Sequence, residues 1–275
     1  MNENTVQIVK KHYENFPVGS LLLRKRYRQP IHRIYVFARV ADDFADEGTM
    51  PSDERIKKLQ EWEGHFHSAM EGKSEIPVLR GLGKSVREFD LPVSLFDDLM
   101  TAFKRDASNP IYPTFADVLE YCTYSANPIG RLLLKIFGCS NEQTERLSDN
   151  ICTALQLTNF WQDISVDTRR NRFYIAHEEF ERYQFSIADL SATNHNDRFL
   201  QYMKEKIDWT KQLFISGAPL FDLISPHFRF ELKLTWHGGM RMLEKIEELN
   251  YDTRHQRPVL DWNDKLIIAY RALRT

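Results

Sequence analysis

The chain has 275 residues, of which 42% are hydrophobic and 12% aromatic, which is enough for a substantial core in one large domain or two small ones. Its formal net charge of −2 excludes the basic surface typical of nucleic-acid-binding proteins, so we expect no nucleic-acid partner. The three cysteines have no metal-ligand spacing, and no stretch has the apolar pattern of a membrane span or a signal peptide. We therefore expect a cytoplasmic protein.

Helical periodicity dominates the chain and no segment alternates with period two, which predicts an all-α fold. The expected helices cover 4–15, 20–28, 30–47, 52–71, 75–88, 92–105, 114–124, 127–137, 141–167, 178–183, 186–191, 196–224, 227–248 and 261–273. Ser52 and Ser140 are predicted to cap their helices, and Thr114 with Asp117 is predicted to form a capping box. Gly48 and Gly138 follow periodic runs and are typical helix stops.

Two pairs of aspartates, each spaced four residues apart, are the most informative feature of the sequence. Asp42 and Asp46 form the first pair, and Asp163 and Asp167 form the second. Residues four apart share a helix face, and both pairs lie in apolar sequence, where an ionised carboxylate is costly unless it is paired or bound to metal. Asn159 lies on the same face as the second pair, and Asp43 is expected to pair only locally.

Carboxylate oxygens suit Mg²⁺, which leaves room for water and phosphate in its coordination sphere. We therefore predict a single domain over residues 1–275 in which two aspartate walls face each other across a central cavity and hold Mg²⁺ around a diphosphate. Asn159 is a candidate neutral metal ligand, with a buried amide as the alternative. For a single aspartate pair, the ordinary alternative is a solvated helix face.

Four further stretches accompany the aspartate pairs, at 12–16 (HYENF), 34–42 (IYVFARVAD), 121–130 (YCTYSANPIG) and 170–174 (RNRFY). With the aspartates they resemble the squalene/phytoene synthase family, the head-to-head prenyl synthases, over nearly the whole chain. The resemblance implies an isoprenoid-synthase-type helical bundle with a central cavity. It also implies an enzyme that acts on a prenyl diphosphate with Mg²⁺, with Asp42, Asp46, Asp163 and Asp167 as catalytic metal ligands.

The resemblance and the spacing together supply a set of candidate substrate-binding residues. His12, Asn15 and Phe16 would contact the substrate from the N-terminal segment. Arg39 would reach a diphosphate oxygen or brace the aspartates. Arg172 and Tyr174 would close over the diphosphate, although a surface ion pair is the alternative for Arg172. Polar groups that would line the pocket or position water are Thr123, Tyr124, Asn127 and Gln156. Gln162 is a further candidate for binding the substrate at its diphosphate.

A reactive carbocation needs an apolar, aromatic wall, and seven side chains are candidates: Phe16, Tyr35, Phe37, Tyr124, Phe160, Trp161 and Trp236. Most aromatic residues at helical spacing belong to an ordinary core, so fewer than half of these are expected to line the pocket. The glycines of the 236–241 stretch (WHGGMR) are expected to let their helix pack closely against a neighbour.

Stretches 14–20, 125–131, 159–163 and 238–247 are similar to the branch of the family that converts presqualene diphosphate to hydroxysqualene in a bacterial squalene route to hopanoids. Glu14, Thr123 and Gln162 stand where dehydrosqualene-type relatives have lysine, tyrosine and arginine. Fewer cations fit a substrate with one diphosphate. We therefore predict a carbon–oxygen lyase that forms hydroxysqualene and diphosphate from presqualene diphosphate and water.

Two alternatives stay open on the sequence alone. The first is head-to-head condensation of two prenyl diphosphates into presqualene diphosphate, dehydrosqualene or phytoene. The second, of another class, is a non-catalytic scaffold or assembly factor, for which retention of all four aspartates is not required. The lipid-like substrate also leads us to expect peripheral contact with the inner membrane and handover with other squalene-pathway enzymes, although no strongly basic amphipathic helix is evident in the sequence.

Overall fold

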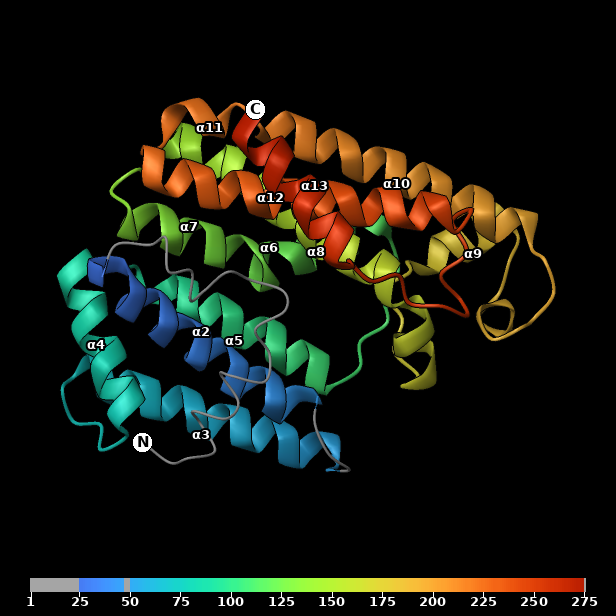
Figure 1. Ribbon diagram of the computed structural model, residues 1–275. Coiled ribbons are helices and arrows are strands. Elements are labelled where there is room, and N and C mark those ends of the chain that lie inside the picture. The colour runs from blue at the N-terminus through green and yellow to red at the C-terminus, as the bar shows by residue number, and fades with distance from the viewer. Residues whose placement is uncertain (1–24, 47–49, 275) are drawn as a thin grey trace. The chain divides into compact units, whose positions relative to one another are not determined.

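The computed structural model describes residues 25–46 and 50–274, and the predicted helix over 4–15 and the predicted stop at Gly48 lie outside these residues. The regular structure in the described part of the chain is helical, without a strand, which confirms the all-α prediction (Figure 1). Within the same residues, no helix combines the length and apolar character needed to cross a bilayer. The chain divides into two compact units, so the predicted single domain and central cavity stay predictions.

Unit 1 consists of residues 1–110, 128–145 and 225–228. It contains α2 (Lys25–Asp46), α3 (Ser52–Met70), α4 (Pro77–Phe89), α5 (Val93–Ala107) and nearly all of α7 (Asn127–Ile136). The buried apolar positions of α2 recur every three or four residues, at Ile34, Phe37, Ala41 and Ala45. The ring of Phe37 lies 5.0 Å from that of Phe66 and 5.4 Å from that of Phe96. This packing fixes the orientation of α2, and with it the flank that carries the first aspartate pair.

Unit 2 consists of residues 111–127, 146–224 and 229–275. It contains α6 (Phe115–Ser125), most of α8 (Glu142–Arg169), α9 (His177–Tyr183), the 3-10 helix η1 (Ile187–Leu190), α10 (Asp197–Gly217), α11 (Leu220–Leu223), most of α12 (Pro226–Glu248) and α13 (Trp262–Arg274). Trp161 of α8 is 1% exposed and donates its indole N–H to the Thr210 hydroxyl at 3.0 Å. α8 is therefore anchored in the core of this unit.

A glycine sets how closely α12 packs. A Cβ atom on Gly239 would meet the ring of Phe214 and, at 3.0 Å, a methyl group of Leu155. The space around Gly238 is open. The predicted close approach is thus confirmed, and it depends on Gly239 rather than on its neighbour.

Two prolines change the predicted helix boundaries. The expected break between helices over 20–28 and 30–47 is wrong, because α2 continues through Pro30. Pro30 is buried beside Ile31, and this packing offsets the missing amide hydrogen bond. The expected continuous helix over 196–224 is also wrong, because it is divided into α10 and α11. Pro219 lies at the break and has no N–H with which to continue the α10 hydrogen-bond ladder.

The predicted helix caps are partly confirmed. Thr114 forms the capping box with Asp117, and Gly138 follows α7 with a φ of +67°. The prediction for Ser52 is wrong, because its hydroxyl donates instead to the Ala107 carbonyl at 2.7 Å. The prediction for Ser140 is also wrong. Its hydroxyl bonds to a carboxylate, while the neighbouring Asn141 accepts from the Thr144 amide at the start of α8.

Candidate functional site

The first aspartate pair lies on the flank of α2, about 100° around the helix from the centre of its buried stripe. Arg39 donates to Asp42 at 2.9 Å and contacts Asp43 at 2.6 Å, so its guanidinium joins two carboxylates. Asp43 pairs locally, as predicted, and is the less exposed of the two. Burial raises the pKa of Tyr35, and the Asp42 and Asp43 carboxylates add to this effect while Arg39 opposes it. Tyr35 therefore keeps its hydroxyl proton and can act as a donor beside the aspartates.

The second pair lies on α8, the 28-residue helix that is anchored through Trp161. Gln156, Asn159, Asp163 and Asp167 follow one another at spacings of three and four residues, so they form a polar row along one face. Asn159 is exposed, which rules out the buried amide that was its alternative. The two aspartate side chains are each about one-sixth exposed, at 17% and 16%. They are accessible to a small ligand while remaining mostly surrounded by protein.

Asp163 has a partner that the sequence did not predict. Arg257 donates its Nε–H to Asp163 Oδ1 at 2.5 Å and its Nη2–H to Oδ2 at 3.4 Å. Arg257 lies in the segment between α12 and α13, 94 residues further along the chain. The segment is held by Gln162, which donates its amide N–H to the Pro258 carbonyl at 2.9 Å. Gln162 is buried, so it positions the cation beside the aspartate.

Asp167 lies where α8 ends and the chain turns back. Asn171 has a φ of +53°, and the amide of Arg172 donates to the Asp167 carbonyl at 2.9 Å. This turn returns the Arg172 side chain to Asp167, with its Nε 3.8 Å from the carboxylate, and to Tyr174, whose hydroxyl it approaches at 3.4 Å. The predicted grouping of Asp167, Arg172 and Tyr174 is therefore found. Arg172 pairs with a nearby acid, as its alternative held, but its side chain is only 14% exposed and so does not belong to the surface.

Aromatic rings pack behind this turn. Tyr174 stacks on Phe160 with ring centroids 3.9 Å apart, and the rings of Tyr112 and Tyr121 lie within 6 Å of it. Beside these rings is a cavity of about 10 Å³, a volume that suits one water molecule. The residues that line it include Phe160, Ile164, Asp167, Arg172 and Tyr174.

The remaining predicted residues divide into those that are described and those that are not. His12, Asn15 and Phe16 lie outside the described residues. Thr123 is exposed and donates its hydroxyl to the Glu120 carbonyl at 2.6 Å. Asn127 is buried and accepts from the Thr153 hydroxyl at 3.0 Å. Tyr124 and Gln156 are half-buried.

Among the aromatic candidates, Phe37 and Trp161 are fully buried core residues, and Phe160 is 3% exposed. These three positions have little ring surface to offer a substrate. Tyr35, Tyr124 and Trp236 are half-buried and keep accessible surface.

The carboxylate sets fit Mg²⁺ chemically. Within residues 25–46 and 50–274, no group of three or more His, Cys, Asp or Glu side chains is placed to hold a metal by itself. Mg²⁺ is commonly bound through one or two carboxylates, with the other positions filled by water and substrate phosphates. Each aspartate pair supplies that number of carboxylates and has an arginine beside it, which suits a metal that arrives with a diphosphate.

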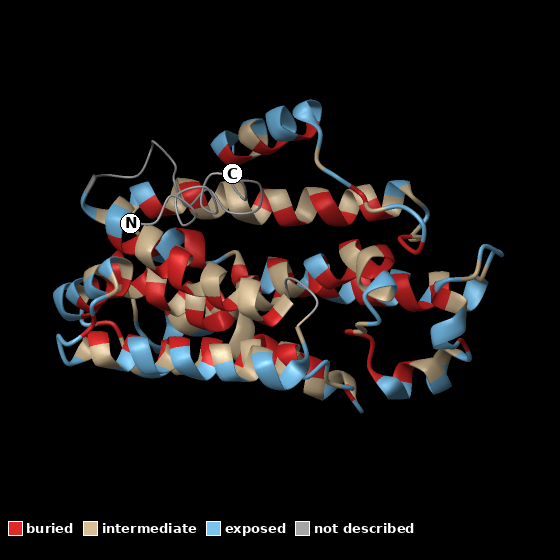
Figure 2. Ribbon diagram, turned by 90° about the horizontal axis from the view of Figure 1, so that it is seen from below, coloured by how far each residue is buried: buried red, intermediate tan, exposed pale blue. Residues whose placement is uncertain are grey.

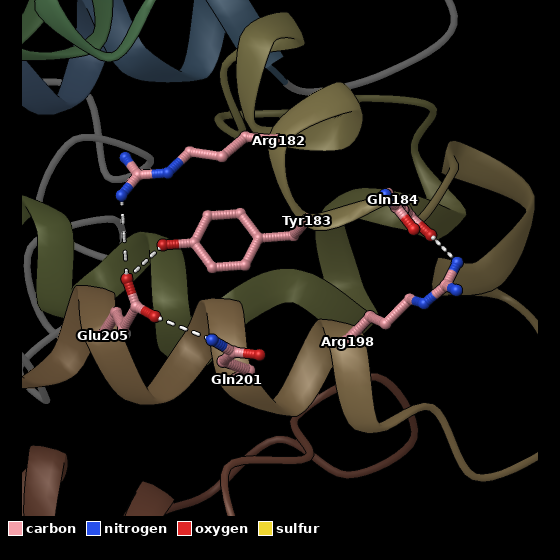
Figure 3. Close-up of a pocket in the computed structure, with 6 residues that line it drawn as sticks. All are labelled: Arg182, Tyr183, Gln184, Arg198, Gln201 and Glu205. Atoms are coloured by element: carbon pink, nitrogen blue, oxygen red, sulfur yellow. Dashed lines mark hydrogen bonds and ion pairs between the residues drawn. The ribbon is translucent and has the colours of Figure 1, made fainter.

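A separate hollow of about 350 Å³ lies between α9 and α10 (Figure 3). Glu205 accepts from Tyr183 and from Gln201, and Arg198 donates to the Gln184 carbonyl at 2.9 Å. Burial and then the Glu205 carboxylate raise the pKa of Tyr183 to about 12. Glu205 thus joins Tyr183, Gln201 and Arg182, and none of the predicted site residues is among those drawn in Figure 3. We interpret this network as a structural link between two helices.

Comparison with known proteins identifies the family. The squalene/phytoene synthase profile matches residues 9–264, which include both aspartate pairs. The chain belongs to the squalene/phytoene synthase family. Hydroxysqualene synthase of Sinorhizobium fredii is 31% identical over 223 residues, which cover 80% of this chain and 75% of that protein.

Two solved structures share the fold of this chain. Squalene synthase HpnC from Alicyclobacillus acidocaldarius matches with a TM-score of 0.83 at 34% identity, over 91% of this chain and 94% of that one. A dehydrosqualene synthase matches with a TM-score of 0.87 at 23% identity, over 98% of this chain and 94% of that one. The predicted isoprenoid-synthase-type helical fold is confirmed for this squalene/phytoene synthase family member.

Proposed function

We propose that this protein converts presqualene diphosphate and water into hydroxysqualene and diphosphate, with Mg²⁺ bound by Asp42, Asp46, Asp163 and Asp167. The observation that carries the proposal is the retention of both aspartate pairs, each on a helix face beside an arginine. The chain that carries these aspartate pairs is 31% identical to a hydroxysqualene synthase and 34% identical to squalene synthase HpnC. A scaffold protein would have no physical need to keep four partly exposed carboxylates.

The arginines are expected to bind the leaving diphosphate. Arg39, Arg172 and Arg257 each lie beside one of the aspartates. A guanidinium suits phosphate oxygens as well as it suits carboxylates, so these side chains can turn to the diphosphate when the aspartates take up metal. The aspartates would hold Mg²⁺, which would supply positive charge to stabilise the diphosphate as the carbon–oxygen bond breaks. Tyr174 supplies a hydroxyl in the same group.

The reaction then requires water at a carbocation. The electron pair of the broken bond leaves with the diphosphate, a water oxygen bonds to carbon, and one proton is released. Tyr124 and Trp236 are the half-buried aromatic candidates of unit 2 for shielding the cation. Gln156 lies on the same α8 face as the aspartates, seven residues before Asp163, and is our candidate for holding the water.

The test is to incubate the full chain with presqualene diphosphate and Mg²⁺ in water enriched in oxygen-18, and to identify the extracted product by mass. A C30 alcohol that carries one labelled oxygen is expected. It should disappear with Asp163→Ala and with a chelator. The matched control is Asp149→Ala, because Asp149 lies on the same helix, about 21 Å before Asp163 along the axis, and should leave turnover unchanged.

The second candidate is head-to-head condensation of two prenyl diphosphates. A dehydrosqualene synthase that is 23% identical shares the fold of this chain, and this shared fold is the reason to test the condensation. Gln162 argues against it, since it is a neutral residue bonded to the Pro258 carbonyl, at the position where the resemblance described above implies an arginine in dehydrosqualene-type relatives. Supplying farnesyl diphosphate alone separates the two. A C30 product from that substrate, with no turnover of presqualene diphosphate, would refute the proposed reaction.

A further inference from the structure

Helix α13 is attached to unit 2 by a polar inner face. Asp264 is 2% exposed and accepts from Arg241 Nε at 2.7 Å, with Lys245 at 3.6 Å. Arg271 pairs with Glu244 of α12 at 2.6 Å. Ile268 and Ala272, one and two turns further on, are buried with Asp264. Ion pairs and a narrow apolar stripe therefore fix which face of α13 is turned outward.

The outward face is apolar, the reverse of an ordinary surface helix. Trp262 and Leu273 are 72% and 75% exposed, and Leu266 and Tyr270 are 55% and 57% exposed. At about 100° per residue, these four side chains fall within an arc of roughly 80°. In Figure 2 the helix that ends near the C mark is exposed along one side and buried along the other. Contiguous exposed apolar surface of this kind indicates an interaction site.

Cations border the apolar arc on both sides. Lys265 and Arg274 are exposed and, by the same helical geometry, lie on opposite flanks of it. Arg274 donates to the Tyr270 hydroxyl at 2.5 Å and lies over its ring at 5.6 Å. The acid within α13, Asp264, is buried and paired, while Asp261 precedes the helix. The surface is therefore apolar at its centre and positive at its edges.

We propose that this face of α13 docks on the surface of a lipid bilayer that contains anionic lipids. Helices that lie in a membrane interface place apolar side chains at the headgroup–acyl boundary and cations at the edges, which is the arrangement found here. Tryptophan and tyrosine favour this boundary, and lysine and arginine near it are attracted to anionic headgroups. A second copy of the chain is a weaker candidate, because an isologous contact would present the same flanking cations from both sides.

The test is co-sedimentation of the full chain with phosphatidylcholine vesicles, with and without phosphatidylglycerol. We expect stronger binding to the vesicles that contain phosphatidylglycerol. Trp262→Gln with Leu273→Gln should lower the partition coefficient about a hundredfold, because each apolar side chain left in water removes a factor of about ten. The matched control is Ile111→Gln, since Ile111 is 80% exposed in the same unit but outside α13. It should bind as the unmodified chain does.

Charge is tested separately from apolar burial. Lys265→Gln with Arg274→Gln should reduce binding to the anionic vesicles about fivefold per cation and leave binding to neutral vesicles unchanged. Failure of the unmodified chain to bind vesicles would overturn the proposal. So would equal losses for the control and the α13 variants, or self-association in solution that the α13 variants abolish. Asp163→Ala should bind vesicles normally, so this result is independent of the reaction proposed above.

Discussion

Gln162→Met tests whether the buried amide positions the segment that carries Arg257. Methionine has nearly the volume of glutamine but cannot donate to the Pro258 carbonyl, which lies 2.9 Å from the Gln162 amide. Gln162 and Pro258 are both buried, so the carbonyl would have no water to replace the lost donor. A buried polar group left without its hydrogen bond costs about 1–3 kcal/mol, and we expect the free energy of unfolding to fall by this amount.

Urea denaturation with linear extrapolation measures this loss. Gln156→Met is the matched control, because Gln156 lies on the same helix, is half-buried, and makes no side-chain hydrogen bond within residues 25–46 and 50–274. Its effect should stay within about 0.5 kcal/mol. A loss for Gln162→Met no larger than that of the control would refute the reasoning.

The same variant links the segment to binding. If Gln162 acts by holding Arg257 against Asp163, then Gln162→Met should raise KM for the diphosphate substrate. Combining it with Arg257→Ala should add little to the effect of Arg257→Ala alone. Fully additive effects on KM would show that the two side chains act independently.

Three further predictions concern stability. Lys206 of α10 pairs with the buried Glu179 of α9, so Lys206→Met should cost about 3–5 kcal/mol in urea denaturation by leaving that carboxylate buried and unpaired. Lys204→Met, at an exposed position of the same helix, should be nearly neutral. Gly239→Ala should overpack this contact at a cost of about 1–3 kcal/mol and so lower the thermal midpoint. Gly238→Ala, which has open space around it, should raise stability by up to about 1 kcal/mol. Burial opposes the ionisation of Asp264, but hydrogen bonds and its arginine partner hold its pKa below the usual 3.8. The ionised carboxylate therefore stabilises the fold fully above pH 3.8, and this contribution is lost as the pH falls below that value. Asp264→Asn should therefore lower stability near neutral pH and flatten the acid limb of a stability–pH profile.

The position of each aspartate pair on one helix face was predictable, because residues four apart in the sequence of a helix share a face. Asp42 and Asp163 each follow an apolar run whose period places the buried side of the helix, and the remaining face follows from it. Arg257 was not predictable, because it lies in a connecting segment and reaches Asp163 across 94 residues of chain. Local patterns contain no information about such a contact.

Gln162 shows the limit of reading a helix face from spacing alone. It lies next to Asp163 and was expected at the diphosphate, yet it is buried and bonded to a carbonyl. One residue along a helix is a rotation of about 100°, which separates a ligand-facing position from a supporting one. Pro30 shows the same limit for boundaries, since tertiary packing kept α2 continuous through a residue that local rules treat as a break.

The polar row on α8 also restricts how this part of the chain can evolve. Gln156 and Asp163 are seven residues apart, which corresponds to about 10 Å along the axis and nearly the same angular position. Substitution at any point in the row changes the chemistry at a fixed distance from the aspartates. Insertion or deletion of one residue would rotate every later side chain by about 100° and send Asp163 and Asp167 into the core. New specificities in this helix should therefore arise by exchange of side chains, whereas changes of length belong in the connecting segments.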